Sequence, residues 1–125
     1  MNEQLKLVVA EDNDTDAALI ARHLARGGIK CTMRRVQTEF DFVDAIKDLK
    51  PDVIISDSNL ITFDGMTALE MARKKFPDVL FIFCCGFFSD AILKEAAEKK
   101  IPCVLKNKDY IGLTRTIQES IGRTV

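Results

Sequence analysis

A chain of 125 residues with 47% apolar content has the size of one domain with a single hydrophobic core, so we expect residues 1–125 to form one domain. Its 18 basic residues nearly balance 19 acidic ones, which argues against direct binding to nucleic-acid phosphates or to an anionic membrane surface. No apolar run has the length of a signal peptide or a membrane span, and we expect a soluble cytoplasmic protein.

The first half of the chain predicts three strands separated by two helices. Residues 5–10 (LKLVVA) form an apolar β-type run, and the helical segment DTDAALIARHLARGG follows and stops at its glycine pair. Residues 30–36 predict a second strand, whose two arginines indicate a sheet edge. The next helix has Thr38 and Asp41 placed as a capping box and ends before a proline. The apolar run DVIISD is typical of a central parallel strand buried on both faces.

The second half continues the same alternation. After the loop SNLITFDG we expect a helix over residues 66–76, a strand at VLFIFCC, and a helix that is capped by Ser89 and ends near Lys100. A short strand at PCVLK and a helix at YIGLTRTIQESIG follow. Each connection is long enough for a crossover helix, which predicts a parallel sheet. The expected fold class is α/β: a doubly wound five-stranded parallel sheet of order 2-1-3-4-5 flanked by five helices (flavodoxin-like).

The residues that follow the predicted strands suggest a site at one edge of this sheet. Glu11 and Asp12 follow the first strand, Asp57 the third and Lys106 the fifth, while Cys85 ends the fourth. Neighbouring carboxylates raise one another's pKa unless a cation balances them, and Mg²⁺ prefers such oxygen ligands. An aspartate beside the metal can attack phosphorus, and a lysine can meet the phosphoryl group as a point charge. Taken singly, the same residues also fit helix caps or a surface lysine.

The four cysteines lack the spacing of a zinc site, and the single histidine, His23, is distant from them in sequence. We interpret Cys31 and Cys84 as small buried apolar residues. A redox pair between Cys85 and Cys103 is disfavoured, because disulfides are uncommon in the cytosol.

At this point the chain resembles the receiver domains of two-component response regulators over nearly its whole length. The motifs are VVAEDN, PDVIISDSNLITFDG and VLK. The resemblance implies that Asp57 is the phosphoacceptor, that Lys106 contacts the phosphoryl group, and that Mg²⁺ is the cofactor. Glu11, Asp12, Asp57 and the backbone carbonyl of Asn59 would then ligate the metal. A histidine kinase or phosphotransfer protein would donate the phosphoryl group, with no enzymatic activity expected beyond self-phosphorylation and self-dephosphorylation.

The resemblance further implies an output surface made by the fourth helix, fifth strand and fifth helix, which a downstream protein partner or effector domain would read. Several positions depart from the family pattern. Cys85 replaces the usual Thr or Ser, Cys103 replaces a Tyr or Phe, and Ile61 and Asn107 replace prolines. A thiol is a poorer donor than a hydroxyl, so we expect a muted conformational response. Phe87 stands where a side chain governs the approach of water, which predicts a long-lived phosphoaspartate.

Two other functions fit parts of the sequence. The cysteine replacements favour a pseudo-receiver that binds proteins without being phosphorylated. The segment DSNLIT faintly resembles aspartate-nucleophile phosphatases, but these carry a second acid where this chain has Asn59. Nucleotide or flavin binding is disfavoured, because the first strand-helix turn is acidic and has no glycine-rich loop.

Overall fold

Five parallel strands form one sheet in the order β2-β1-β3-β4-β5, and this confirms the predicted topology. The computed structural model describes residues 4–58, 64–106 and 110–121. The strands are β1 (Leu5–Ala10), β2 (Cys31–Val36), β3 (Val53–Ser56), β4 (Leu80–Cys85) and β5 (Cys103–Leu105). The helices are α1 (Asp14–Arg26), α2 (Glu39–Leu49), α3 (Gly65–Lys75), α4 (Asp90–Lys99) and α5 (Tyr110–Ile121). These bounds differ from the predicted ones by one or two residues at most ends.

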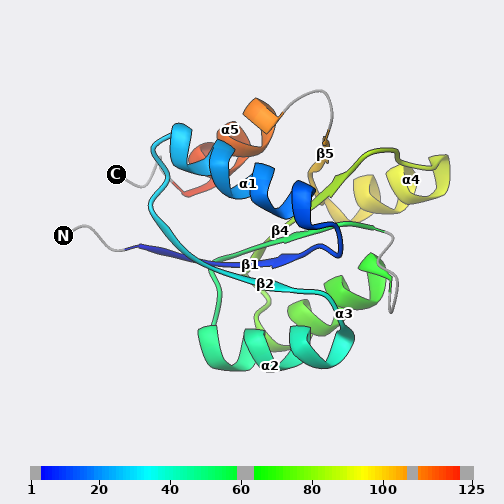
Figure 1. Ribbon diagram of the computed structural model, residues 1–125. Helices are drawn as coiled ribbons and strands as arrows, with labels where there is room; N and C mark the ends of the chain where they lie inside the picture. The colour runs from blue at the N-terminus through cyan, green and yellow to red at the C-terminus, as the bar shows by residue number, and fades with distance from the viewer. Residues whose placement is uncertain (1–3, 59–63, 107–109, 122–125) are drawn as a thin grey trace.

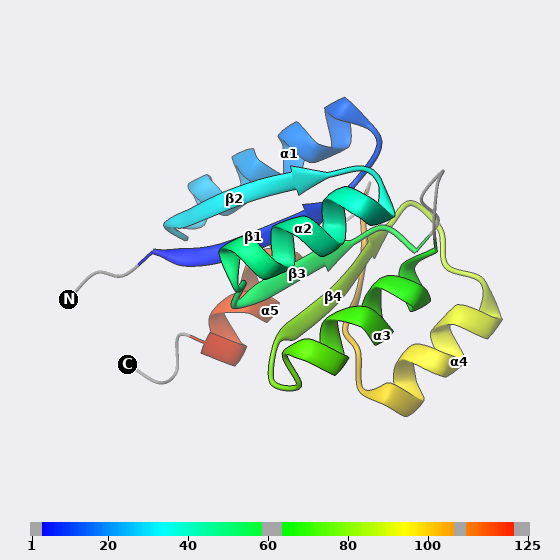
Figure 2. The same cartoon turned by 90° about the horizontal axis from the view of Figure 1, so that it is seen from below.

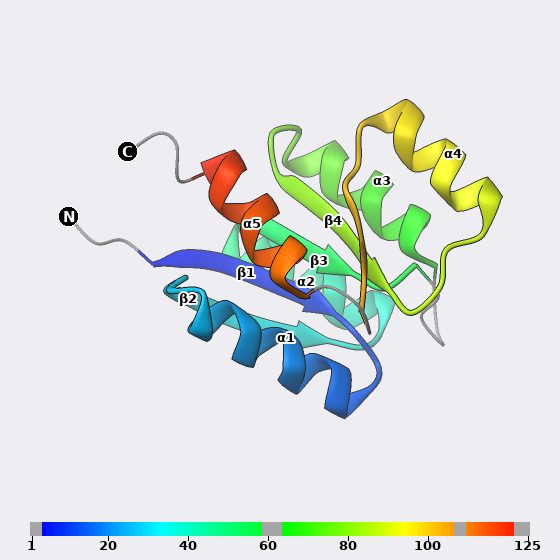
Figure 3. The ribbon, with the colours of Figure 1, turned by 90° about the horizontal axis from the view of Figure 1, so that it is seen from above.

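Helices cover both faces of the sheet (Figure 1). Helices α2, α3 and α4 lie on one face, as Figure 2 shows from below, and α1 and α5 lie on the other, as Figure 3 shows from above. Because side chains alternate along a strand, β3 divides its apolar residues between the two layers. Ile54 packs with the α2 and α3 side, whereas Val53 and Ile55 pack with α1 and α5. Burial on both sides explains why this strand is almost wholly apolar.

The same alternation separates the two neighbouring cysteines of β4. Cys84 packs into the cluster under α1 and α5, and Cys85 faces the opposite side. Both are buried. Strand β2 lies at the edge of the sheet, which explains why it tolerates Arg34 and Arg35.

Each of the first four helices begins at a side-chain cap that accepts a hydrogen bond from a backbone N–H three residues later. The predicted caps Thr38 and Ser89 are confirmed, with bonds of 3.1 Å to Asp41 N and 3.2 Å to Ile92 N. Asn13, which follows Glu11 and Asp12, caps α1 in the same way, accepting from Asp16 N at 2.9 Å. None of the described helices is long and apolar enough to cross a membrane.

Gly65, the first residue of α3, allows this helix to approach the end of β3. A Cβ atom there would lie 2.7 Å from Phe83 Cε1, 2.8 Å from Ser58 Cα and 2.9 Å from Asp57 O. Since two of these atoms belong to the backbone, they cannot move aside without shifting the chain.

We therefore expect Gly65→Ala to lower the free energy of unfolding by about 1–3 kcal/mol, through overpacking. Urea denaturation measures the change. Gly86→Ala is the control, because a Cβ at Gly86 meets nothing within 4 Å. Equal effects of the two substitutions would show that the close approach of α3 is unimportant.

Candidate functional site

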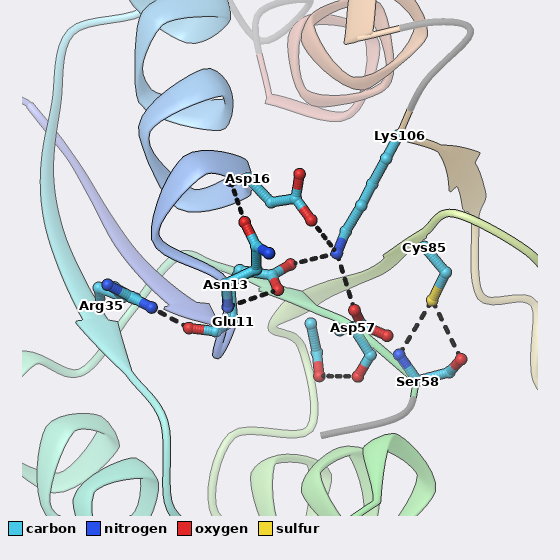
Figure 4. Close-up of polar contacts among 9 residues, drawn as sticks. Glu11, Asn13, Asp16, Arg35, Asp57, Ser58, Cys85 and Lys106 are labelled. Atoms are coloured by element: carbon cyan, nitrogen blue, oxygen red, sulfur yellow. Dashed lines mark hydrogen bonds and ion pairs between the residues drawn. The ribbon is translucent and has the colours of Figure 1, made fainter. Parts of the chain in front are cut away.

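The carboxyl ends of β1, β3 and β5 bring Glu11, Asp57 and Lys106 together (Figure 4). Backbone hydrogen bonds continue the sheet ladder one residue beyond the strands and fix these positions. Asp57 N donates to Ala10 O at 3.1 Å, and Lys106 N donates to Cys85 O at 2.9 Å. Helices α1 and α3, which follow β1 and β3, depart to opposite faces, so the site lies where a doubly wound sheet leaves a crevice.

The Lys106 ammonium lies at the centre of the site and contacts three carboxylates. Its Nζ is 2.7 Å from Glu11 Oε1, 2.8 Å from Asp57 Oδ2 and 2.9 Å from Asp16 Oδ2. The lysine side chain is 10% exposed and that of Glu11 only 1%, whereas Asp57 and Asp16 are 14% and 29% exposed. The buried end of the cluster is therefore Glu11, and the solvent side is Asp16.

Asp16 is the member of this cluster that sequence reasoning missed. It lies in the first turn of α1, where its backbone N–H donates to the Asn13 side chain at 2.9 Å. Asn13 N in turn donates to Glu11 Oε2 at 3.1 Å. Recognising Asn13 as the helix cap places Asp16 on the first turn beside the strand end, and this was the signal that could have found it.

Burial and ion pairing shift the pKa values of the central residues in definite directions. Burial raises the pKa of Glu11, and the hydrogen bond and charge of Lys106 counteract this only in part. Burial acts to lower the pKa of Lys106, but its hydrogen bonds to Asp57, Glu11 and Asp16 outweigh that effect and raise the pKa overall. The ammonium is therefore firmly protonated and acts as the fixed cation of the cluster.

Cys85 lies beside the site and forms hydrogen bonds with Ser58, the residue that follows Asp57. Its Sγ accepts a hydrogen bond from Ser58 N at 2.9 Å and donates one to Ser58 Oγ at 3.0 Å. Burial raises the pKa of the Cys85 thiol to about 12; the bonds from Ser58 oppose this shift and the nearby Asp57 adds to it. The thiol is therefore protonated and unreactive at neutral pH. All four cysteines are free, including Cys103 on the neighbouring strand.

No protein-family model matches the chain. It is 26% identical over 124 residues to the protein-glutamate methylesterase/protein-glutamine glutaminase of Rhodopseudomonas palustris (strain HaA2). The matched region covers 98% of this chain and 31% of that protein. It is 31% identical over 72 residues to the hybrid signal transduction histidine kinase G of Dictyostelium discoideum. That match covers 58% of this chain and 2% of that protein. The chain thus spans less than a third of these curated relatives.

A solved structure decides the fold. The signal receiver domain of a DNA-binding response regulator from Colwellia psychrerythraea 34H matches with a TM-score of 0.85 at 18% identity, over 95% of this chain and 99% of that one. The chain has the receiver-domain fold. The resemblance expected from the sequence motifs is therefore confirmed.

The receiver resemblance implies Mg²⁺, and the residues at the strand ends fit this ion in part. The carboxylates of Glu11, Asp12 and Asp57 are hard oxygen donors of the kind that Mg²⁺ prefers. Within residues 4–58, 64–106 and 110–121, however, no three Asp, Glu, His or Cys side chains are grouped so that they could hold a metal ion. Lys106 Nζ contacts the oxygens of Glu11 and Asp57 instead. Asn59, the expected carbonyl ligand, lies outside the described residues, as do Ile61 and Asn107.

Lys106 should be essential for the stability of this domain at neutral pH. Lys106→Met keeps the apolar stem but leaves the buried Glu11 carboxylate without its cation. We expect the free energy of unfolding to fall by about 3 kcal/mol, since an unpaired buried charge is strongly destabilising. Urea denaturation at neutral pH measures the loss.

Lys99→Met is the matched control, because Lys99 pairs with Glu95 at 3.1 Å on the exposed surface of α4. That pair should contribute less than about 0.5 kcal/mol. A loss at Lys106 no larger than the loss at Lys99 would contradict the central role of the ammonium.

Proposed function

We propose that this domain accepts a phosphoryl group on Asp57 from a histidine kinase or phosphotransfer protein, in a two-component signalling system. The observation that carries the proposal is the position of Asp57, whose Oδ2 lies 2.8 Å from Lys106 Nζ at the end of the most buried strand. Its side chain is 14% exposed, so a donor can reach it. Curated relatives of the chain include a histidine kinase, which supports this class of partner.

The chemistry requires an oxygen nucleophile and a cation beside it. An Asp57 oxygen attacks phosphorus, the new O–P bond forms, and the P–N bond of the phosphohistidine donor breaks with its electron pair left on the imidazole. The Lys106 ammonium lies beside the Asp57 carboxylate, where it would contact an oxygen of a phosphoryl group carried by Asp57. Mg²⁺, held by Glu11, Asp12, Asp57 and the carbonyl of Asn59, would neutralise phosphoryl charge when bound.

We place the output surface on α4, β5 and α5, because three exposed apolar side chains lie on α4, on β5 and in the segment before α4. Phe87, Leu93 and Leu105 are 77%, 43% and 39% exposed, and they lie just after β4, on α4 and on β5. Such exposure fits a surface that a downstream protein or effector domain covers. The high exposure of Phe87 fits a place on this output surface better than a role in excluding water from Asp57. Leu113 and Ile117 of α5 belong to the core, and the side chain of Ile111 lies outside the described residues.

A second function is favoured by the cysteine at the end of β4. Cys85 offers no hydroxyl to a phosphoryl oxygen, and its thiol is occupied by Ser58. A domain with this arrangement can also serve as a binding module that needs no phosphorylation. The melting temperature with Mg²⁺ and beryllofluoride, a mimic of the phosphoryl group, distinguishes the two functions, because only a competent site is stabilised by the mimic.

Asp57→Asn should abolish phosphorylation. The parent, incubated with Mg²⁺ and acetyl phosphate, should gain the mass of one phosphoryl group, and the variant should gain none, because an amide is not a nucleophile toward phosphorus. Intact-protein mass spectrometry measures the gain. Asp52→Asn is the control, since Asp52 lies at the opposite end of β3 and binds Lys6 N. Labelling of Asp57→Asn at the parent level would refute the assignment.

Cys85→Thr should strengthen the coupling between Asp57 and the output surface, because a hydroxyl donates a stronger hydrogen bond to a phosphoryl oxygen than a thiol does. We expect larger backbone chemical-shift changes on α4 and β5 when Mg²⁺ and beryllofluoride are added. Cys85→Val is the control, since valine has the shape of threonine without the hydroxyl. If the Val variant responds as strongly as the Thr variant, packing rather than hydrogen bonding controls the response.

A further inference from the structure

The contact between Asp16 and Lys106 is the part of the site that the proposed function does not use. Asp16 Oδ2 lies 2.9 Å from Lys106 Nζ, nearly as close as Asp57 Oδ2, which lies at 2.8 Å. We infer that Asp16 is a positioning residue that competes with the phosphoryl group for Lys106, and thereby weakens the binding of phosphoryl oxygens to the site. This inference rests on the proposed function of Asp57.

The crowding of carboxylates around the lysine favours such a competition. A lysine ammonium has three N–H donors and no acceptor. Nζ donates hydrogen bonds to Asp57 at 2.8 Å and Asp16 at 2.9 Å, and Glu11 Oε1 lies 2.7 Å away as a third carboxylate paired with the ammonium. A phosphoryl oxygen that approaches Lys106 must therefore displace one of these carboxylates.

Exposure identifies Asp16 as the carboxylate that leaves. Glu11 is 1% exposed, so its carboxylate cannot turn from Lys106 into solvent. Asp57 is the residue that carries the phosphoryl group. Asp16 is 29% exposed, so its carboxylate can turn into solvent and recover hydration. The exchange thus replaces one anion on Lys106 by another.

The contact is built into the start of α1. The Asn13 side chain accepts from Asp16 N at 2.9 Å, and Asn13 N donates to Glu11 Oε2 at 3.1 Å. These bonds join the first turn of the helix to the end of β1 and hold the Asp16 backbone opposite Lys106. Asp16→Asn leaves both bonds in place and removes only the charge of the side chain.

The test compares binding of beryllofluoride at saturating Mg²⁺, measured by isothermal titration calorimetry because the chain contains no tryptophan. Asp16→Asn should bind the mimic about fivefold more tightly, which is the scale of a partly exposed ion pair. Asp16→Glu keeps the competing charge and should stay close to the parent.

Asp14→Asn is the matched control. Asp14 lies on the same turn of α1 and carries the same charge, but its ion pair is with Arg35. Its substitution should change the affinity by less than about twofold if contact, rather than net charge, is responsible. Equal tightening in Asp14→Asn and Asp16→Asn, or no tightening in Asp16→Asn, would overturn the inference while leaving the proposed function intact.

A measurement without Mg²⁺ or mimic tests the contact itself. The ¹⁵N resonance of Lys106 Nζ should shift in Asp16→Asn and not in Asp14→Asn, and an unchanged resonance would refute the contact. A parent protein that fails to bind the mimic, although the resonance shifts as expected, would instead refute the proposed function and the competition with it.

Discussion

The ion cluster around Lys106 is the constraint on which the rest of the site depends. Carboxylates that follow β1 and β3, and a third from α1, contact the ammonium that follows β5, and the most deeply buried of them is Glu11. Such a carboxylate is tolerated only with a cation beside it. Lys106, just after β5, must therefore reach past β4 and β3 toward the end of β1, and the hydrogen bonds of the sheet hold these strand ends in place. The ion cluster that stabilises the fold also contains the residues on which the proposed phosphoryl chemistry depends.

Much of this arrangement could be predicted because it follows from simple periodicities. The alternation of apolar strands and helices predicted a parallel sheet, and the carboxyl ends of parallel strands necessarily meet at one edge. Glu11, Asp57 and Lys106 were therefore placed together by the topology alone. The two-residue period of a strand likewise explains why Cys84 and Cys85 face opposite sides of the sheet.

What the sequence did not show depends on side-chain contacts between elements. Asp16 looked like an ordinary acid in the first turn of a helix, where negative charge is favourable for any helix. Only the reach of Lys106 reveals its second role. The hydrogen bonds between Ser58 and Cys85 could not be predicted for a similar reason. They depend on the backbone N–H and the hydroxyl of Ser58 both facing β4 rather than solvent. The role of Asn59 stays a prediction, because this residue lies outside the described part of the chain.

The distribution of the cysteines has a practical consequence. Cys84 and Cys85 are buried thiols whose pKa values burial raises to about 12, so maleimides and similar reagents will react with them slowly. Cys31 and Cys103 are half-buried and begin β2 and β5, the two edge strands of the sheet. Labels attached there would span the full width of the sheet. The natural sequence thus supplies a pair of attachment points for distance spectroscopy across the domain, with no engineered cysteine near the site.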